Sequence, residues 1–407
     1  MKRILVVGGG FAGLWSAVGA ARTLDAFGVG DGAVEITLVD REAHHNIRVR
    51  NYEADLRDAR VPFDEVLGPI GVKRIEAEVH AMDFVARQVT VATPRGELRL
   101  PYDRLVFALG SALHRPGIPG LAEHGFDVDT YAGAQKLSVH LTGLAARPDH
   151  AGRTTVIVVG AGLTGIEVAA EMPARLRAAL GAGGPAFKVI LADAGLELGS
   201  GMGAAAQPVI EAALRSLDVE ARLGASIASV DAAGVTLASG ARIAGATVVW
   251  CAGMRASPLT SLFPVTRDSL GRLPVDSFLR VQGVANVFAA GDAARAMIDD
   301  MHASVMSCQH GRPMGRYAGH NAVADLLGRP MLSLRIERYV TCLDLGSWGA
   351  LYTEGWNRAV IATGAAAKQT KQTINRIRIY PPRSGNRAEI LAAAEPVVQA
   401  APSVRAD

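Results

Sequence analysis

Two glycine-rich segments, residues 8–13 and 160–165, carry the clearest chemical signal in the sequence. The spaced glycines are Gly8, Gly10 and Gly13 in the first segment and Gly160, Gly162 and Gly165 in the second. Glycines at this spacing form a tight turn and let bare backbone approach a pyrophosphate, while the helix that follows offers unpaired N–H groups to the phosphate charge. Each segment therefore predicts a dinucleotide-binding turn.

Strands and helices must flank these turns if they are to work. Arg3–Val7 and Thr154–Val159 are short apolar runs typical of buried parallel strands, and an alanine-rich helix is expected after each turn. The next strand of each unit should end in an acid that accepts hydrogen bonds from ribose hydroxyls. Asp40 and Asp193 stand at those places, although Asp40 comes later than the usual spacing of about 20 residues.

The second acid also bears on cofactor choice. Asp193 pairs with a ribose 2′-hydroxyl and repels a 2′-phosphate, so NADH is favoured over NADPH, although Lys188 and Arg222 could lie nearby. Two nucleotide sites in one chain suit a tightly bound flavin and an exchanging nicotinamide, because hydride transfer needs the two rings in contact. We expect FAD at the N-terminal turn and NAD(H) at the second.

The amino-acid composition limits the fold class and the kinds of partner that this protein can have. A chain of 407 residues exceeds one hydrophobic core, and 45 glycines with 49% apolar and only 5% aromatic residues suit an α/β protein. A net charge of +3 with scattered basic residues argues against nucleic acid. Three widely separated cysteines indicate a reducing, cytoplasmic location, and no apolar stretch reaches the roughly 18 residues of a membrane span.

We therefore predict an α/β protein with two Rossmann-like dinucleotide-binding domains, antiparallel β inserts and a short C-terminal α+β region. Residues 1–120 and 265–328 form the FAD-binding domain, and residues 121–264 form the NAD(H)-binding domain. Residues 329–407 form the C-terminal region, whose last residues, after Pro381 and Pro382, are expected to be frayed or weakly helical.

Further segments resemble a known family. Tyr102–Gly110 looks like a strand ending in a small-residue turn, Val287–Asp292 looks like a flavin motif, and Val248–Pro258 and Gly162–Glu167 are more specific. Over roughly residues 3–325 the chain resembles the two-dinucleotide-domain flavoprotein reductases, and within them the type II NADH dehydrogenases, which are non-proton-pumping NADH:quinone oxidoreductases.

The resemblance implies roles for individual residues. Asp292 would accept a hydrogen bond from the flavin ribityl chain, and Glu167 would be a polar group at the flavin–nicotinamide junction, unless it only caps its helix. Gln309 would be the second catalytic group. The remaining predicted cofactor-binding residues are Phe11, Ala12, Arg41, Val79, Ala108, Gly110 and Gly291 for the flavin, and Thr164, Ala252 and Gly253 for the nicotinamide cofactor.

The acceptor is expected to be a small molecule. Because the sequence has no redox cysteine pair, electrons must leave the flavin directly, which favours a quinone-type acceptor. The family usually has two glutamines one helical turn apart. This chain has Gln309 at the first place but Pro313 at the second, so the sequence does not decide whether the acceptor is a quinone. Two alternatives remain: a reductase of a ferredoxin- or rubredoxin-like protein, and an NADH-sensing flavoprotein with little turnover.

The last predictions concern the C-terminal segment and four histidines. The basic, half-apolar segment Lys368–Tyr380 is compatible with peripheral docking on the inner face of the cell membrane or with a solvated surface. The sequence does not decide whether the protein forms a homodimer. Four histidines lack metal-ligand spacing, so no metal is predicted and packing or flavin-edge contacts are expected. They are His44, His45, His302 and His310.

Overall fold

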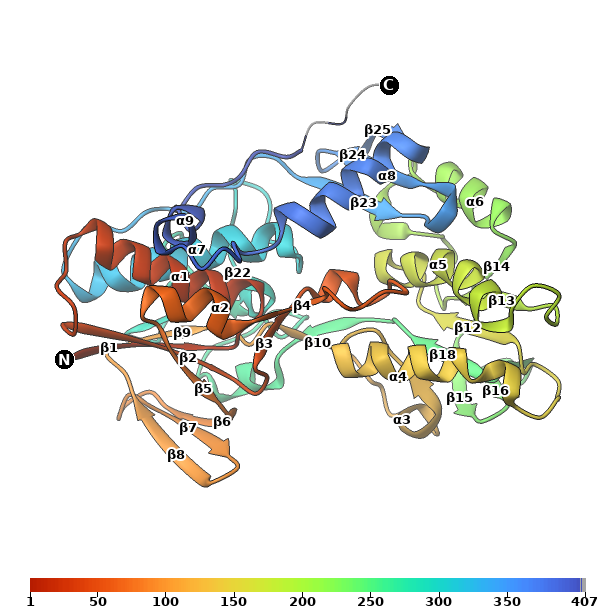
Figure 1. Ribbon diagram of the computed structural model, residues 1–407, viewed down its shortest axis with the longest axis horizontal. Coiled ribbons are helices and arrows are strands. Elements are labelled where there is room, and N and C mark those ends of the chain that lie inside the picture. The colour runs from red at the N-terminus through yellow and green to blue at the C-terminus, as the bar shows by residue number, and fades with distance from the viewer. Residues whose placement is uncertain (403, 405–407) are drawn as a thin grey trace.

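The computed structural model describes residues 1–402 and 404. Figure 1 shows two α/β units side by side, the N-terminal unit in red and orange and the second unit in yellow and green, with the blue C-terminal region running across the top of both. Each unit is built on a parallel five-stranded sheet, which confirms the predicted α/β class. No helix in the described part of the chain is long and apolar enough to cross a membrane.

The first unit is a doubly wound sheet with strand order β21-β9-β1-β2-β5. Its strands are β1 (Lys2–Val7), β2 (Val34–Asp40), β5 (Lys73–Glu76), β9 (Arg104–Phe107) and β21 (Val287–Ala289). All neighbours are parallel, and the β1 residues Ile4 to Val7 are buried because helices cover one face and an antiparallel sheet the other. That sheet consists of β6 (Glu78–Asp83), β7 (Gln88–Thr93) and β8 (Gly96–Pro101).

Two helices, α1 (Phe11–Ala26) and α7 (Cys308–Leu326), pack tightly on the first sheet. Glycines make this close approach possible, because a Cβ on Gly315 would lie 2.3 Å from the Ala12 carbonyl oxygen and one on Gly319 would lie 2.1 Å from that of Ser16. The short elements of this unit are β3 (His44–Asn46), β4 (Arg60–Pro62), α2 (Phe63–Leu67), β20 (Leu273–Pro274) and β22 (Ala294–Arg295). The start of α7 is thereby fixed beside the start of α1.

The second unit repeats the design with strand order β11-β18-β12-β13-β14. Its strands are β11 (Gly125–Phe126), β12 (Thr155–Val159), β13 (Lys188–Ala192), β14 (Val219–Arg222) and β18 (Thr247–Trp250). Its helices are α3 (Leu121–His124), α4 (Tyr131–Thr142), α5 (Leu163–Leu180) and α6 (Gln207–Ser216), and its antiparallel insert is β15 (Ile227–Asp231), β16 (Gly234–Leu237) and β17 (Arg242–Ala244). The two crossings between the units, β10 (Ser111–Leu113) and β19 (Met254–Ala256), pair with each other in an antiparallel ribbon.

The C-terminal region is an antiparallel sheet followed by helices. It comprises β23 (Val340–Asp344), β24 (Ala350–Glu354), β25 (Ala359–Thr363), α8 (Gly364–Thr373), a π-helical turn (Ile374–Arg378) and α9 (Arg387–Ala393). The sheet packs on the second unit, where a Cβ on Gly346 would lie 2.2 Å from the Ala170 oxygen, and the chain then returns to α1. Of the expected frayed or weakly helical end, α9 is helical and is not frayed, because Ile390 and Leu391 are buried against the first core.

Candidate active site

The first glycine turn joins β1 to α1 and cannot tolerate side chains. Gly8 has φ +98°, and a Cβ there would lie 2.4 Å from the Ala108 oxygen, while one on Gly13 would lie 1.6 Å from the Gly8 oxygen. A Cβ on Gly10, in contrast, meets no atom within 4 Å. The turn is therefore closed towards the protein and open at Gly10, where a pyrophosphate would approach the first amides of α1.

The second turn, between β12 and α5, has the same construction. Gly160 has φ +108°, and its Cβ would lie 2.8 Å from the Cα of Ala252, while a Cβ on Gly165 would lie 1.7 Å from the Gly160 oxygen. A Cβ on Gly162 again meets open space, and Thr164 in the first turn of α5 is exposed. Ala108 and Cys251 occupy equivalent places, since their amides donate to the oxygens of Val7 and Val159. Two residues after each comes a left-handed glycine, Gly110 at φ +62° and Gly253 at φ +81°.

The two predicted ribose acids also stand in equivalent places. Asp40 accepts hydrogen bonds from the Gly9 and Glu42 amides at 2.5 and 2.8 Å. Asp193 accepts them from the Ala161 and Gly195 amides at 2.5 and 2.6 Å. Burial raises the pKa of Asp40, and the two backbone hydrogen bonds oppose that rise. Each carboxylate is thus held against its own glycine turn, as a ribose-binding acid must be.

Two further predicted flavin residues flank Asp40. Arg41 follows it and is exposed. Val79 is buried at the start of β6, just after Ala77, whose amide donates to the Asp40 carbonyl oxygen at 2.9 Å. The structure therefore places both residues close to Asp40 along the chain and across this hydrogen bond.

The segment after β21 closes the first site from the other side. A Cβ on Gly291 would lie 2.7 Å from that of Ala12. Asp292 accepts a hydrogen bond from the Ser111 hydroxyl at 2.6 Å and lies 3.9 Å from the Arg48 guanidinium. Burial raises the pKa of Asp292, and Ser111 and Arg48 counteract the rise. The carboxyl ends of β1, β9 and β21 thus meet at one place, where open α/β sheets bind their ligands.

Phe11 is the last of the predicted flavin residues, and it is partly covered by His45. The two rings are 4.9 Å apart, edge to face. The Nδ1 of His45 is 2.9 Å from the Gly9 oxygen, and burial lowers the pKa of His45 to about 4. His45 is therefore a neutral packing group beside the first turn at ordinary pH.

The predicted catalytic glutamate lies in a buried ion pair. Glu167, on the second turn of α5, receives hydrogen bonds from the Lys371 ammonium at 2.7 Å and from the Asp344 amide at 3.0 Å. The side chains of Glu167 and Lys371 are 12% and 9% exposed. Burial raises the pKa of Glu167, and the neighbouring Lys371 charge acts in the opposite direction. Lys371, from the basic tail segment, therefore covers this glutamate.

Tyr52, Asp344 and Lys368 extend this cluster, and no role at this site was predicted for them from the sequence. The Tyr52 hydroxyl donates to Asp344 at 3.0 Å, and Lys368 pairs with the same carboxylate at 2.5 Å. Burial, together with the Glu167 charge, raises the pKa of Tyr52 well above its usual value. These groups come from the first unit and from the C-terminal region, which are far apart in the sequence. Their contact therefore cannot be predicted from the spacing of residues within one segment.

Gln309 reaches the same strand from the opposite end. With its amide oriented to satisfy both groups, Gln309 donates to the Val340 oxygen at 2.7 Å and accepts from the Val340 amide at 3.2 Å. Gln309 thus contacts the first residue of β23, and Glu167 contacts its last residue, Asp344. The two predicted catalytic residues are attached to one strand, which spans the junction of the two units and the C-terminal region.

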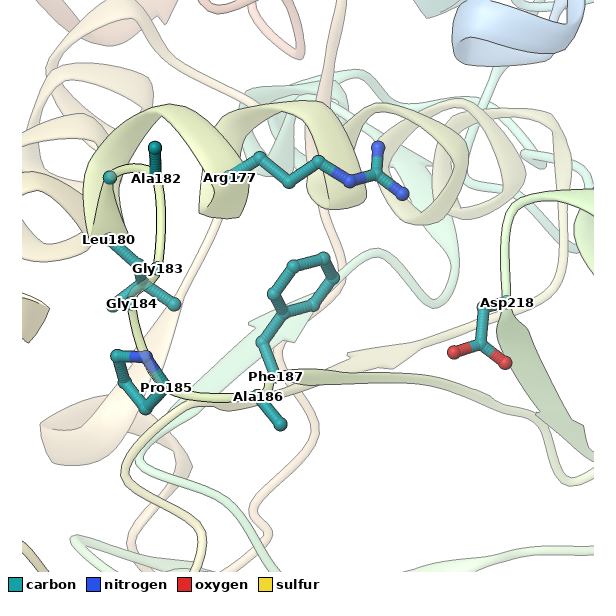
Figure 2. A pocket seen from close by; sticks show the side chains of 10 residues that line it. Arg177, Leu180, Ala182, Gly183, Gly184, Pro185, Ala186, Phe187 and Asp218 are labelled. Carbon is teal, nitrogen blue, oxygen red and sulfur yellow. The ribbon is translucent and has the colours of Figure 1, made fainter.

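A surface hollow elsewhere is not the site. Figure 2 shows it at the end of α5, where Phe187 lies beneath Arg177 at 5.6 Å and Asp218 stands at the rim. It adjoins the amino end of β13, opposite the carboxyl ends at which such sheets bind nucleotides. Within residues 1–402 and 404, no group of three or more His, Cys, Asp or Glu could hold a metal ion.

Comparisons with known proteins agree with this geometry. The profile of the pyridine nucleotide-disulphide oxidoreductases matches residues 2–315. An NADH dehydrogenase-like protein of Mycobacterium tuberculosis is 58% identical over 403 residues, which cover 99% of this chain and 100% of that protein. A demethylphylloquinone reductase of Synechocystis is 28% identical over 358 residues, 86% of each chain.

A solved structure of NDH2 from Plasmodium falciparum in complex with NADH has the same fold, with a TM-score of 0.74 over 97% of both chains at 12% identity. Together these matches confirm the resemblance to type II NADH dehydrogenases and the prediction of FAD and NAD(H) as cofactors. The chain belongs to the pyridine nucleotide-disulphide oxidoreductase family, as an NADH dehydrogenase-like oxidoreductase.

Proposed function

We propose that this protein oxidises NADH at a bound FAD and passes the two electrons to a quinone-type acceptor. The observation that carries the proposal is the pair of equivalent glycine turns at the carboxyl ends of two parallel sheets, each with its ribose acid. A relative named as a demethylphylloquinone reductase supports the choice of acceptor. The balanced reaction takes NADH, one proton and a quinone to NAD⁺ and the quinol.

FAD would be held by residues 1–120 and 265–328 and NADH by residues 121–264, with residues 329–407 closing the junction. The glycine turn at residues 8–13, Asp40 and Asp292 would hold the pyrophosphate, the ribose and the ribityl chain. The flavin, when bound, supplies the group that accepts hydride and later releases electrons. Asp193 favours NADH because it would repel a 2′-phosphate.

The residues of the junction would supply a proton. Quinone reduction consumes protons, and Lys371 carries one within 2.7 Å of Glu167. Burial tends to lower the pKa of Lys371, but the charge of Glu167 outweighs it and keeps the ammonium protonated. The Asp344 amide donates to Glu167 at 3.0 Å and the Tyr52 hydroxyl donates to the Asp344 carboxylate at 3.0 Å, so these groups hold Glu167 in place beside Lys371. We assign Glu167 and Gln309 as polar groups that position this junction.

The proposal places the reaction in the cytoplasm, with peripheral contact at the inner membrane face where lipid quinones lie. The test is NADH oxidation by purified holoenzyme with menadione, with a ferredoxin and with no acceptor. We expect turnover with menadione to exceed both other rates by at least tenfold. Faster turnover with the protein acceptor, or turnover with neither, would reject the quinone assignment.

A further inference from the structure

The chain crosses between the two units at the ribbon formed by β10 and β19, and Figure 1 shows β10 between them. Ser111 on β10 pairs with Ala256 on β19, and Leu113 pairs with Met254. The ribbon has two strands, and an isolated two-stranded ribbon is only marginally stable in itself. The angle between the units therefore depends on contacts outside the ribbon.

Residues 48–60 of the first unit supply such contacts, because this segment packs against the second unit at α4. The apolar part of the contact is small: Leu56 and Ala59 form a cluster with Ala134, and Tyr131 lies against it. This cluster is separate from the large cores of the two units. Units of one chain move relative to each other unless their interface is large and apolar. Polar contacts must therefore hold the units in place on this side.

Arg48, at the start of this segment, makes the polar contact between the units. Its guanidinium donates to the carboxylate of Asp129, which lies just before α4. It also donates to the carbonyl and hydroxyl oxygens of Ser111 at 3.2 and 3.0 Å, and it lies 4.0 Å from the sulfur of Met254. Asp292 is 3.9 Å away and accepts from the same Ser111 hydroxyl at 2.6 Å. One side chain thus links the first unit, both strands of the ribbon and the second unit.

The carboxylate of Asp129 is itself held in place. Its second oxygen accepts a hydrogen bond from the Leu113 amide at 3.1 Å, and the Asp129 amide donates to Asp127 at 3.0 Å. The side chains of Arg48 and Asp129 are 28% and 16% exposed, so water screens the pair only in part. A planar guanidinium that donates in several fixed directions orients its acceptors as well as attracting them. The pair can therefore fix an angle and not only a distance.

We propose that the Arg48–Asp129 pair holds the second unit at the angle at which the nicotinamide ring of NADH stacks on the flavin. Arg48 is a positioning residue, because it acts through the orientation of the two units. It also lies beside Asp292, the expected partner of the flavin ribityl chain, so the pair connects the flavin site to the NADH-binding unit. Hydride transfer is sensitive to such placement, since a shift of about 1 Å can cost on the order of 100-fold in rate. This inference rests on the proposed function, because it concerns the hydride step from NADH to FAD.

The test is anaerobic stopped-flow reduction of the holoenzyme at several NADH concentrations, which separates the limiting rate of flavin reduction from the dissociation constant of NADH. We expect Arg48→Met and Asp129→Ala each to lower the limiting rate about tenfold or more and to change the dissociation constant less than about threefold. Arg48→Lys keeps the charge without the planar fork and should lose less. The double variant should be no slower than either single variant, because both changes remove the same contact.

A spectrum and a matched variant distinguish positioning from general damage. The long-wavelength absorbance that stacked nicotinamide and flavin rings produce should weaken in Arg48→Met and Asp129→Ala. The control is Arg104→Met: Arg104 pairs with Asp325 inside the first unit, and these side chains are 16% and 29% exposed, which is similar to the Arg48–Asp129 pair. It should keep the limiting rate of the parent protein. Retained flavin absorbance verifies folding of each variant.

The outcomes separate this inference from the proposed function. Parental limiting rates in Arg48→Met and Asp129→Ala, or an equal loss in Arg104→Met, would overturn it. A slow Arg48→Met with a normal Asp129→Ala would also overturn it, because the arginine would then act on the flavin without the second unit. If the variants lose reduction by NADH as expected but the parent protein fails to reduce menadione, the inference holds and the quinone assignment alone is rejected.

Discussion

Replacing Lys371 by methionine should expose how strongly the junction depends on its buried ion pair. In the described chain Lys371 is the one cation within 4.0 Å of the Glu167 carboxylate. Methionine preserves most of the side-chain volume but leaves Glu167 with the Asp344 amide as its remaining donor, at 3.0 Å. A carboxylate without its counter-ion would then remain at a site where its side chain is 12% exposed.

The expected loss is large. Removal of one partner from a buried pair costs roughly 3–5 kcal/mol, because the other charge stays buried and unpaired. The loss should also depend on pH. Glu167 already has a raised pKa, and without Lys371 it rises further, so the folded variant binds a proton that the unfolded chain does not hold above about pH 4.5. The stability deficit should therefore grow as pH rises from 4.5 and shrink in acid.

Thermal unfolding of the holoenzyme, followed by flavin fluorescence at pH 5 and pH 7.5, measures this deficit. Glu167→Gln combined with Lys371→Met should recover most of the loss, since no charge is then left unpaired. The control is Lys73→Met, because the Lys73–Glu35 pair has an ammonium that is 66% exposed and such pairs contribute roughly 1 kcal/mol or less. A Lys371→Met variant as stable as the parent at both pH values would refute the reasoning.

Three other perturbations have defined outcomes. Gly165→Ala should abolish flavin reduction by NADH while FAD stays bound, because the new Cβ would lie 1.7 Å from a carbonyl oxygen of the second turn; normal reduction in stopped flow would contradict this. Asp193→Ser should raise the KM for NADH about tenfold and improve NADPH use, and unchanged selectivity in steady-state assays would reject the ribose role. His45 has its pKa lowered to about 4 by burial, so the unfolded chain, with a histidine pKa near 6.5, takes up the proton first and folding loses about 2 kcal/mol by pH 5. His45→Asn should flatten the decline of the melting temperature between pH 6.5 and 4; an unaltered slope would exclude His45 as its source.

The glycine turns could be predicted because their chemistry is local. Gly8 and Gly160 need positive φ, and Gly13 and Gly165 must pass within van der Waals contact of the preceding turn, so the residue types follow from a few neighbouring atoms. Asp40 ends the next strand of the first unit and Asp193 directly follows that of the second, and both were predicted by the same rule.

The junction could not be predicted in this way. The contact of Glu167 with Lys371 joins two helices 204 residues apart, and the sequence around Lys371 reads equally well as a solvated basic face. The burial of Arg316 likewise depends on where α1 and the tail pack against α7. Such charges are identified by tertiary packing, which periodicity alone does not specify.

The most direct test of the central claim is anaerobic stopped-flow mixing of the purified flavoprotein with NADH, followed by mixing of the reduced enzyme with a water-soluble quinone. The account predicts rapid bleaching of the flavin band by NADH, slower bleaching by NADPH, and rapid reoxidation by the quinone. Absence of bound flavin, or bleaching by NADH without reoxidation by any quinone, would contradict it.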